Sequence, residues 1–406
     1  MANYTALIVL VAIAIGFLDL LTDHWPKLQR QIFPLAALAL YSLFVVMYYF
    51  GPDIWTYVPY YENISSVSQL IANPESCHPF EFGYGVFCSL LHSTGLSYYW
   101  MTVLVKTLYF VAIYLLLRKL PKRQMFALAC IILIDRDLIT HELRECLAVT
   151  FFIFMILLLQ NRKYILAVLC SIITISMHKT GIAPVGLTLL GIFFYNHRQD
   201  GSAYAILIGI LMLMIALPVQ RISESMLQFL PLPQVYIQAL SHHLLLGRQF
   251  QLIAFIYLGA LLLLNIYINY SQKPMRFTWL TYTVLAGMAV VVVIYPYYFL
   301  LARIRSYFVP IVVYYLVLLL GDEERSKAVP YSSLMKQVFM LLILIYYIHF
   351  AINLERFTRQ LHAPIAKGST IFQLRNSSPE QIRKRQMKIA ERYWSQDYMK
   401  EKGNRL

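Results

Sequence analysis

The sequence HELRECLAVTFFIFMILLL, residues 141–159, joins a charged turn directly to a long apolar run. Four titratable residues come first in it: His141, Glu142, Arg144 and Glu145. Charged side chains are costly inside a bilayer, and those near a span usually face headgroups, a protein interior or a watery cavity. The stretch therefore predicts a transmembrane helix whose charged first turn faces headgroups, a protein interior or a watery cavity.

The composition of the whole chain predicts an integral membrane protein. Of its 406 residues, 59% are hydrophobic and only 13% are charged, and the mean hydropathy of +0.61 is too high for a soluble domain. The apolar runs predict an all-α polytopic membrane protein with about twelve transmembrane helices, roughly 11 to 13. These runs cover residues 5–22, 33–50, 98–117, 124–140, 146–160, 164–182, 183–196, 203–219, 251–270, 278–299, 302–320 and 335–353.

Lysine and arginine lie in alternate short loops, which sets the orientation because such loops stay in the cytoplasm. Residues 51–98 contain four acidic residues and no Lys or Arg, so we expect this loop, like residues 220–250, to lie outside. No positive region precedes the first apolar run, so we expect it to be a retained span with an outer amino end. A disulfide between Cys77 and Cys88 in the outer loop is left open.

The sequence divides into a transmembrane region, residues 1–353, and a basic tail, residues 354–406. The tail contains 12 Lys or Arg and five Asp or Glu. Ser378 and Pro379 fit the N-cap and first position of a helix, which either lies on anionic headgroups or is solvated. Twelve crossings would leave this tail outside, against the positive-inside rule, so its side is undecided.

Nucleotide and metal motifs are absent from the sequence. It has no G-x-x-x-x-G-K-[ST] loop and no G-x-G-x-x-G after a strand, which argues against ATP-driven transport. His242 and His243 are adjacent rather than helically spaced, and no H-x-x-x-H or C-x-x-C pair occurs. We therefore expect no metal and no cofactor.

Arginines at the predicted outer side are unexpected in a positive-inside protein. They are Arg136, Arg144, Arg221, Arg248, Arg303 and Arg305. Each alone could snorkel or pair with a carboxylate, as Arg136 could with Asp135 or Asp137. Together they favour a cavity for a polyanion, because guanidinium groups match phosphate oxygens two at a time. A polyprenyl-diphosphate-linked sugar on a bacterial membrane has this chemistry.

Three outer segments add candidate groups. In YYFGPDIWTYVPYYENI, residues 48–64, Asp53 stands among aromatic residues, which indicates either a sugar site or an aromatic belt with a turn aspartate. Glu81 lies among rings and glycines in HPFEFGYGVF, residues 78–87. His178 ends a predicted span and is either a base or a satisfied interface residue.

In this order the segments resemble the EpsG-like family of bacterial membrane proteins, which is similar to the Wzy-type polysaccharide polymerases. The resemblance covers residues 1 to about 320 and rests on five motifs: Gly51, Asp53 and Tyr57; Glu81, Phe82, Gly83 and Tyr84; Arg144, Glu145 and Ala148; His178 and Thr180; Arg303, Tyr307 and Phe308. Two positions depart from the family pattern: an arginine is missing before Gly51, and Glu145 replaces a glutamine.

The resemblance implies a metal-independent membrane glycosyltransferase at the outer, periplasmic face of the bacterial inner membrane. It would polymerise undecaprenyl-diphosphate-linked oligosaccharide into exopolysaccharide, capsule or O-antigen, by transfer from the diphosphate to a sugar hydroxyl. Its expected partners are this lipid-linked glycan, membrane lipid and a chain-length regulator protein, with no nucleic acid.

Residue roles follow from the resemblance and from position. The diphosphate would be bound by Arg144 and Arg303, helped by Arg221 and Arg248. The general base would be Asp53, with Glu81 or His178 as second choices. The sugar would contact Trp55, Tyr57, Tyr60 and Glu145.

On this interpretation, the turn at residues 141–145 opens a helix whose positive end and free N–H groups already favour an anion. Arg144 adds donors, and Glu142 or Glu145 could hold its rotamer. A salt-bridged helix cap without chemistry explains the same residues. A flippase for the same lipid is the alternative function, although it would more naturally show repeated halves. An O-acyltransferase fits less well because His178 is not deep in a span.

Overall fold

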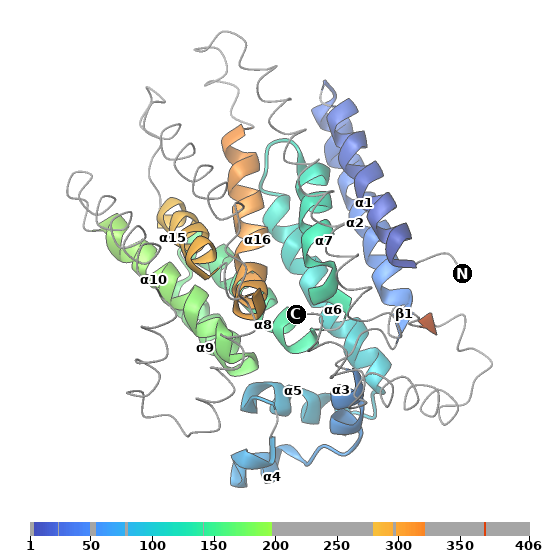
Figure 1. The fold of residues 1–406 in the computed structure, drawn as a ribbon, viewed down its shortest axis with the longest axis vertical. Helices are drawn as coiled ribbons and strands as arrows, with labels where there is room; N and C mark the ends of the chain where they lie inside the picture. Colours follow the sequence, from blue (N-terminus) through green and yellow to red (C-terminus); the bar gives the residue numbers. More distant parts are fainter. Residues whose placement is uncertain are drawn as a thin grey trace, which may run out of the picture. The chain divides into compact units, whose positions relative to one another are not determined.

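The fold is helical throughout the part of the chain that the computed structural model describes. The described residues are 4–22, 24–48, 54–77, 80–140, 142–196, 279–294, 298–320 and 369–370. Besides helices, they contain one antiparallel pair of two-residue strands (Figure 1). The chain divides into two compact units, Met1–Lys179 with Leu316–Leu406, and Thr180–Tyr315.

The first unit is built from nine of the described α-helices and the strand pair. Its helices are α1 (Tyr4–Leu21), α2 (Pro26–Val46), α3 (Ile54–Glu62), α4 (Val67–Ala72), α5 (Phe82–Ser93), α6 (Tyr98–Leu117), α7 (Gln124–Thr140), α8 (Leu143–Gln160) and α9 (Tyr164–Met177). Its strands are β1 (Met47–Tyr48) and β2 (Ser369–Thr370), and a 3-10 turn η1 (Pro74–Cys77) precedes α5. Helix α1 packs on α7, α2 on α6 and α7, and α8 on α6 and α9.

The helices confirm the prediction of an all-α protein for the described residues. Among these, α2, α6 and α8 are long and apolar enough to cross a membrane, and α1 and α9 include shorter apolar stretches. The predicted runs at 124–140, 183–196, 278–299 and 302–320 fall on described helices. Several other predicted features lie outside the described residues: the runs at 203–219, 251–270 and 335–353, the loop 220–250 with Arg221 and Arg248, Asp53, His141, and the helix begun by Ser378.

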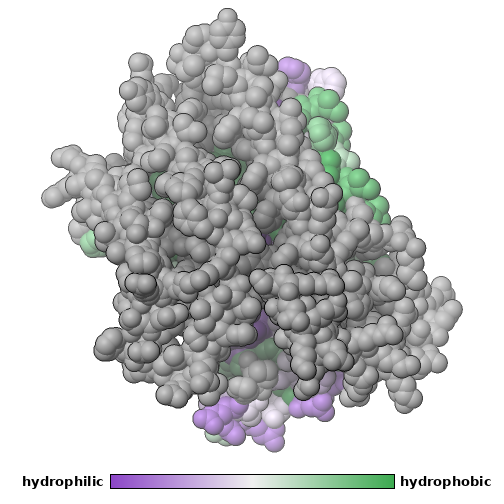
Figure 2. All heavy atoms as spheres, viewed as in Figure 1, coloured by the Kyte–Doolittle hydropathy of each residue, from purple (hydrophilic) through white to green (hydrophobic). Residues whose placement is uncertain are grey.

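The predicted outer loop, residues 51–98, contains helices α3, α4 and α5. They gather at the end of the first unit where α2 ends and α6 begins (Figure 1). Ser66 and Gln69 form a capping box at the start of α4, in which Ser66 N–H donates to Gln69 Oε1 at 3.1 Å. Figure 2 shows hydrophilic atoms over this end and apolar atoms along α1 and α2, where Leu10 and Leu35 are exposed. This division suits a unit with lipid at its side and water at its end.

A buried lysine fixes the point where α2 gives way to helices α3, α4 and α5. Lys106 on α6 is 2% exposed, and its Nζ donates to the carbonyl oxygens of Phe44 at 2.9 Å and Met47 at 3.0 Å. The last carbonyls of a helix lack intrahelical partners and carry its negative end, so an ammonium is favourable there. Directly beyond, Met47 pairs with Thr370 in the β1–β2 ladder. A short piece of the tail therefore lies at this end of the unit.

A buried aspartate joins three helices at the opposite end. Asp19 in α1 is fully buried, and its Oδ2 accepts from the backbone N–H of Phe126 at 3.0 Å, in the first turn of α7. Its carbonyl oxygen accepts from Gln29 Nε2 at 2.8 Å and from Arg123 Nη1 at 3.2 Å. The carboxylate therefore caps α7 from another helix, in place of the local cap that most helices use.

The second unit packs helices through small residues. It contains α10 (Ile182–Asn196), α15 (Trp279–Ile294) and most of α16 (Tyr298–Leu320), and begins in the 3-10 turn η2 (Lys179–Gly181). A Cβ built on Gly191 of α10 would lie 2.8 Å from the backbone N of Thr283 in α15. Only a residue without a side chain lets these two backbones approach so closely, as is common between membrane helices.

We predict that Asp19→Ala lowers the free energy of unfolding by about 1–2 kcal/mol, the usual effect of losing a helix cap, because the N–H groups of α7 lose their acceptor. Asp19→Asn retains an oxygen acceptor and should cost less. Thermal unfolding in detergent measures both. Equal stability of Asp19→Ala and wild type would show that this cap contributes nothing.

Candidate functional site

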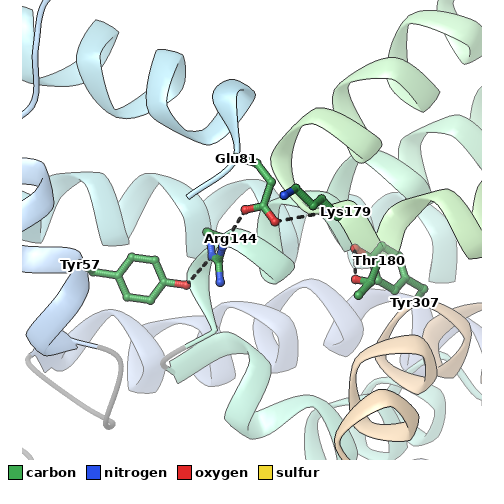
Figure 3. Close-up of polar contacts among 6 residues, drawn as sticks. All are labelled: Tyr57, Glu81, Arg144, Lys179, Thr180 and Tyr307. Carbon is green, nitrogen blue, oxygen red and sulfur yellow. Dashed lines mark hydrogen bonds and ion pairs between the residues drawn. The ribbon is translucent and has the colours of Figure 1, made fainter. Parts of the chain in front are cut away.

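The charged turn of the opening sequence forms a compact polar cluster in the first unit. Arg144, in the first turn of α8, donates from Nη1 to Glu81 Oε2 at 2.6 Å. Its Nε donates to the hydroxyl of Tyr57 at 3.2 Å. Figure 3 shows the carboxylate and the phenol approaching the guanidinium from different sides. Arg144 is thus held by α3 and by the start of α5.

The ion pair is only partly shielded from solvent, with side-chain exposures of 18% for Arg144 and 11% for Glu81. Nε and Nη1 are occupied, while Nη2 of Arg144 makes no hydrogen bond to the described residues. Because a guanidinium has five N–H donors, the group can hold its two protein partners and still bind an oxyanion through Nη2. The cluster can therefore position an arginine for an anionic ligand.

Aromatic rings also contact this arginine. Cζ of Arg144 lies 4.7 Å from the centroid of the Phe80 ring, within the range of a cation–π contact. Phe80 stacks on Tyr57 with centroids 5.0 Å apart, and Tyr60 and Tyr84 meet Phe80 edge-on at 4.5 and 5.4 Å. The rings pack around Phe80 and Tyr57, the two aromatic residues that contact the guanidinium.

Glu81 also joins this cluster to α9. Its Oε1 accepts from the backbone N–H of Lys179 at 3.3 Å, just beyond the end of α9 (Figure 3). The approach depends on Gly83, since a Cβ at that position would lie 2.7 Å from Cβ and the carbonyl oxygen of Ser176. The first turn of α5 can therefore contact the last turn of α9 only with glycine at residue 83.

The partner of Arg144 differs from the expected one. The sequence interpretation paired it with Glu142 or Glu145, which are close along the chain, whereas the structure pairs it with Glu81, 63 residues away. Neighbours one and two positions apart on a helix point to different faces, which explains the difference. Glu142 is the N-cap residue of α8, and Glu145 is 3% exposed within it.

The other candidates of the first unit lie at the same end of it. Tyr57 is buried and Tyr60 half-buried, and both contact Phe80. His178 is 3% exposed and is the C-cap residue of α9, next to the Lys179 N–H that Glu81 binds. The backbone of Trp55 belongs to α3, and its side chain, like Asp53, lies outside the described residues.

Two family-like motifs meet within the second unit. The hydroxyls of Thr180 and Tyr307 are 3.4 Å apart, and Tyr307 is fully buried in α16 (Figure 3). Arg303 lies one turn earlier on α16 and is exposed. Its role in binding the diphosphate stays a prediction.

Two cysteines lie beside the cluster as free thiols, so the disulfide that the sequence left open is absent here. Burial raises the pKa of Cys88 to about 12 and also raises the pKa of Cys77. Both thiols are therefore protonated near neutral pH, which makes them poor nucleophiles. In the part of the chain that is described, no group of three His, Cys, Asp or Glu is placed to hold a metal ion.

Sequence reasoning missed Phe80, Gly83 and the Lys179 N–H as parts of the cluster. The signal for Phe80 and Gly83 was present in the segment HPFEFGYGVF, which surrounds Glu81 with rings and glycines. No signal marked Lys179, because its contribution is a backbone N–H.

Comparison with known proteins identifies one family. The model of the EpsG family matches residues 30–360, a range that contains the whole cluster around Arg144. No curated protein and no solved structure matches the chain.

We predict that Gly83→Ala moves α5 away from α9 and breaks the Glu81–Lys179 contact, since no void exists for the added methyl group. Overpacking of this kind typically costs about 1–3 kcal/mol, seen as a lower melting temperature in detergent. Gly186→Ala is the matched control, because a Cβ there meets nothing within 4 Å and alanine favours a helix. Equal melting temperatures for Gly83→Ala and wild type would contradict the close contact.

Proposed function

Because the chain belongs to the EpsG family, and thereby to polysaccharide biosynthesis, we propose that it polymerises lipid-linked oligosaccharide repeat units. The donor would be a glycan on undecaprenyl diphosphate, at the outer face of the bacterial inner membrane. The observation that carries the proposal is the setting of Arg144. Its guanidinium is partly buried and held by Glu81 and Tyr57, and Nη2 is available for an oxyanion. The product would be an exopolysaccharide, a capsule or an O-antigen.

Position supports an anionic ligand that arrives from the outer side. Arg144 stands in the first turn of α8, an 18-residue helix whose N-cap residue gives no side-chain hydrogen bond. Free N–H groups and the positive end of the helix dipole favour negative charge at this point. The surrounding segment, residues 51–98, has no Lys or Arg, so Arg144 supplies positive charge where the loop itself has none.

The reaction exchanges one bond at the anomeric carbon for another. An acceptor sugar hydroxyl forms the new bond, and the bond to the diphosphate oxygen breaks through an oxocarbenium-like state. The electron pair leaves with the diphosphate, so negative charge grows there as the transition state forms. A fixed guanidinium stabilises that growing charge more than it stabilises the ground state, which is the requirement for catalysis. The family resemblance implies Arg303 as a second donor to the diphosphate.

The hydroxyl proton must pass to a general base. Both oxygens of Glu81 already accept hydrogen bonds, from Arg144 and from the Lys179 N–H. This arrangement favours Glu81 as a residue that positions Arg144. Asp53 remains our first choice of base and His178 the second. Rings such as Tyr57 and Tyr60 suit the apolar faces of sugars in the same segment.

We predict that purified wild type, given the lipid-linked repeat unit of its own organism, produces a ladder of longer glycans on a gel. Arg144→Ala should reduce the rate about 100- to 1000-fold, the usual effect of losing a donor to a developing oxyanion. Asp53→Asn should reduce it about 100-fold or more if Asp53 is the base.

Lys163→Ala is the control for a lost positive charge, because Lys163 is exposed beyond the far end of α8. It should leave the ladder unchanged. A folded wild type that leaves the repeat unit unextended would contradict polymerisation and favour a flippase, which liposome transport would then measure.

A further inference from the structure

One outer arginine has no role in the reaction described above. Arg136 lies in α7, four residues before that helix ends at Thr140. It is 1% exposed and is among the largest fully buried side chains of the described residues. Guanidinium groups are seldom buried to this extent unless they are paired.

The pairing that Arg136 has is weak. Its Nε lies 3.4 Å from Oδ1 of Asp137, longer than the usual 2.7–2.9 Å of a charge-assisted hydrogen bond. The side chain of Asp137 is 26% exposed, so water competes for its charge. The carboxylate on the other side, Asp135, accepts from the hydroxyl of Tyr109 at 2.7 Å. Neither neighbour fully compensates the buried cation.

One nitrogen of this guanidinium has no partner among the described residues. Within the described part of the chain, Nη1 of Arg136 is buried and makes no hydrogen bond. A buried donor without an acceptor is destabilising, and more so when it belongs to a charged group. Such a group in a folded protein requires an explanation, and a bound anion is one that uses both its charge and its free donor.

Arg136 and Arg144 lie at the same end of one helical hairpin. Only residues 141 and 142 separate α7 from α8, and the two helices pack together. Arg136 is about one turn from the end of α7, and Arg144 is in the first turn of α8. The hairpin therefore carries two guanidinium groups near its tip, which suits a ligand with two linked phosphates.

We propose that Arg136 is a second binding residue for a diphosphate at the outer end of the α7–α8 hairpin. This deepens the proposed function and rests on it for the identity of the substrate, a polyprenyl diphosphate. Nη1 of Arg136 donates to a phosphate oxygen, and Arg144 binds the same group through Nη2. The diphosphate then supplies an acceptor to Nη1 of Arg136, which has none among the described residues.

The test uses the full chain in detergent and three probes: inorganic pyrophosphate, farnesyl diphosphate and phosphatidylglycerol. Binding is followed as the rise in melting temperature with probe concentration, which increases when a ligand binds only the folded state. The variants are Arg136→Gln, Arg136→Lys, and the control Arg118→Gln at the exposed end of α6.

We expect wild type and Arg118→Gln to bind pyrophosphate and farnesyl diphosphate equally well. Arg136→Gln should bind both at least about tenfold more weakly, and Arg136→Lys should fall between because it retains charge but loses the planar fork. Without ligand, Arg136→Gln should melt no lower than wild type, because it removes a poorly compensated buried charge. If Arg136→Gln does not fold, Arg136→Lys provides the same comparison.

Three results would overturn the assignment of Arg136. The first is unchanged affinity for pyrophosphate in Arg136→Gln and Arg136→Lys, and the second is that neither diphosphate binds to wild type. The third is that phosphatidylglycerol competes equally well with the diphosphates, which would indicate a site for bulk lipid. The product ladder separates this assignment from the proposed function. A normal ladder with unchanged pyrophosphate affinity in the Arg136 variants would contradict only the role of Arg136. Diphosphate binding that depends on Arg136, without any ladder, would contradict only polymerisation.

Discussion

The ion pair between Glu81 and Arg144 is the contact on which one end of the first unit, formed by α3, α4 and α5, depends. It joins the start of α5 to the first turn of α8, while the other oxygen of Glu81 reaches the backbone beyond α9. Three parts of the chain that are far apart in sequence therefore meet at one carboxylate. A partly buried pair of this kind is worth more than an exposed one, because solvent screens it less.

The same pair allows an arginine to stand at the mouth of an apolar helix. An arginine alone at the mouth of a span would be costly and mobile, whereas one held by a carboxylate, a phenol and a ring has a fixed orientation. The orientation leaves Nη2 for a ligand. Lys106 and Asp19 serve the scaffold in a related way, by placing single buried charges at helix ends that would otherwise lack partners.

Among the described residues, the sequence predicted the helices of the apolar runs, because apolar runs of span length have few other solutions. It did not predict α3, α4 or α5, which lie in the expected outer loop. It also singled out Arg144 and Glu81, since titratable residues beside apolar segments are conspicuous. It did not pair them, because the contact joins residues 63 positions apart and local periodicity carries no such information. Gly83 was visible as part of a motif, but its reason, the closeness of Ser176, exists only in three dimensions.

The most direct test of the central claim is an electron cryomicroscopy structure of the full chain with a short-chain polyprenyl diphosphate bound. We predict a phosphate oxygen within hydrogen-bonding distance of Nη2 of Arg144, with the contacts of Arg144 to Glu81 and Tyr57 retained. Diphosphate density at a site that Arg144 does not touch would contradict the account. So would a complex in which Glu81 no longer contacts Arg144, because the carboxylate would then not position that side chain.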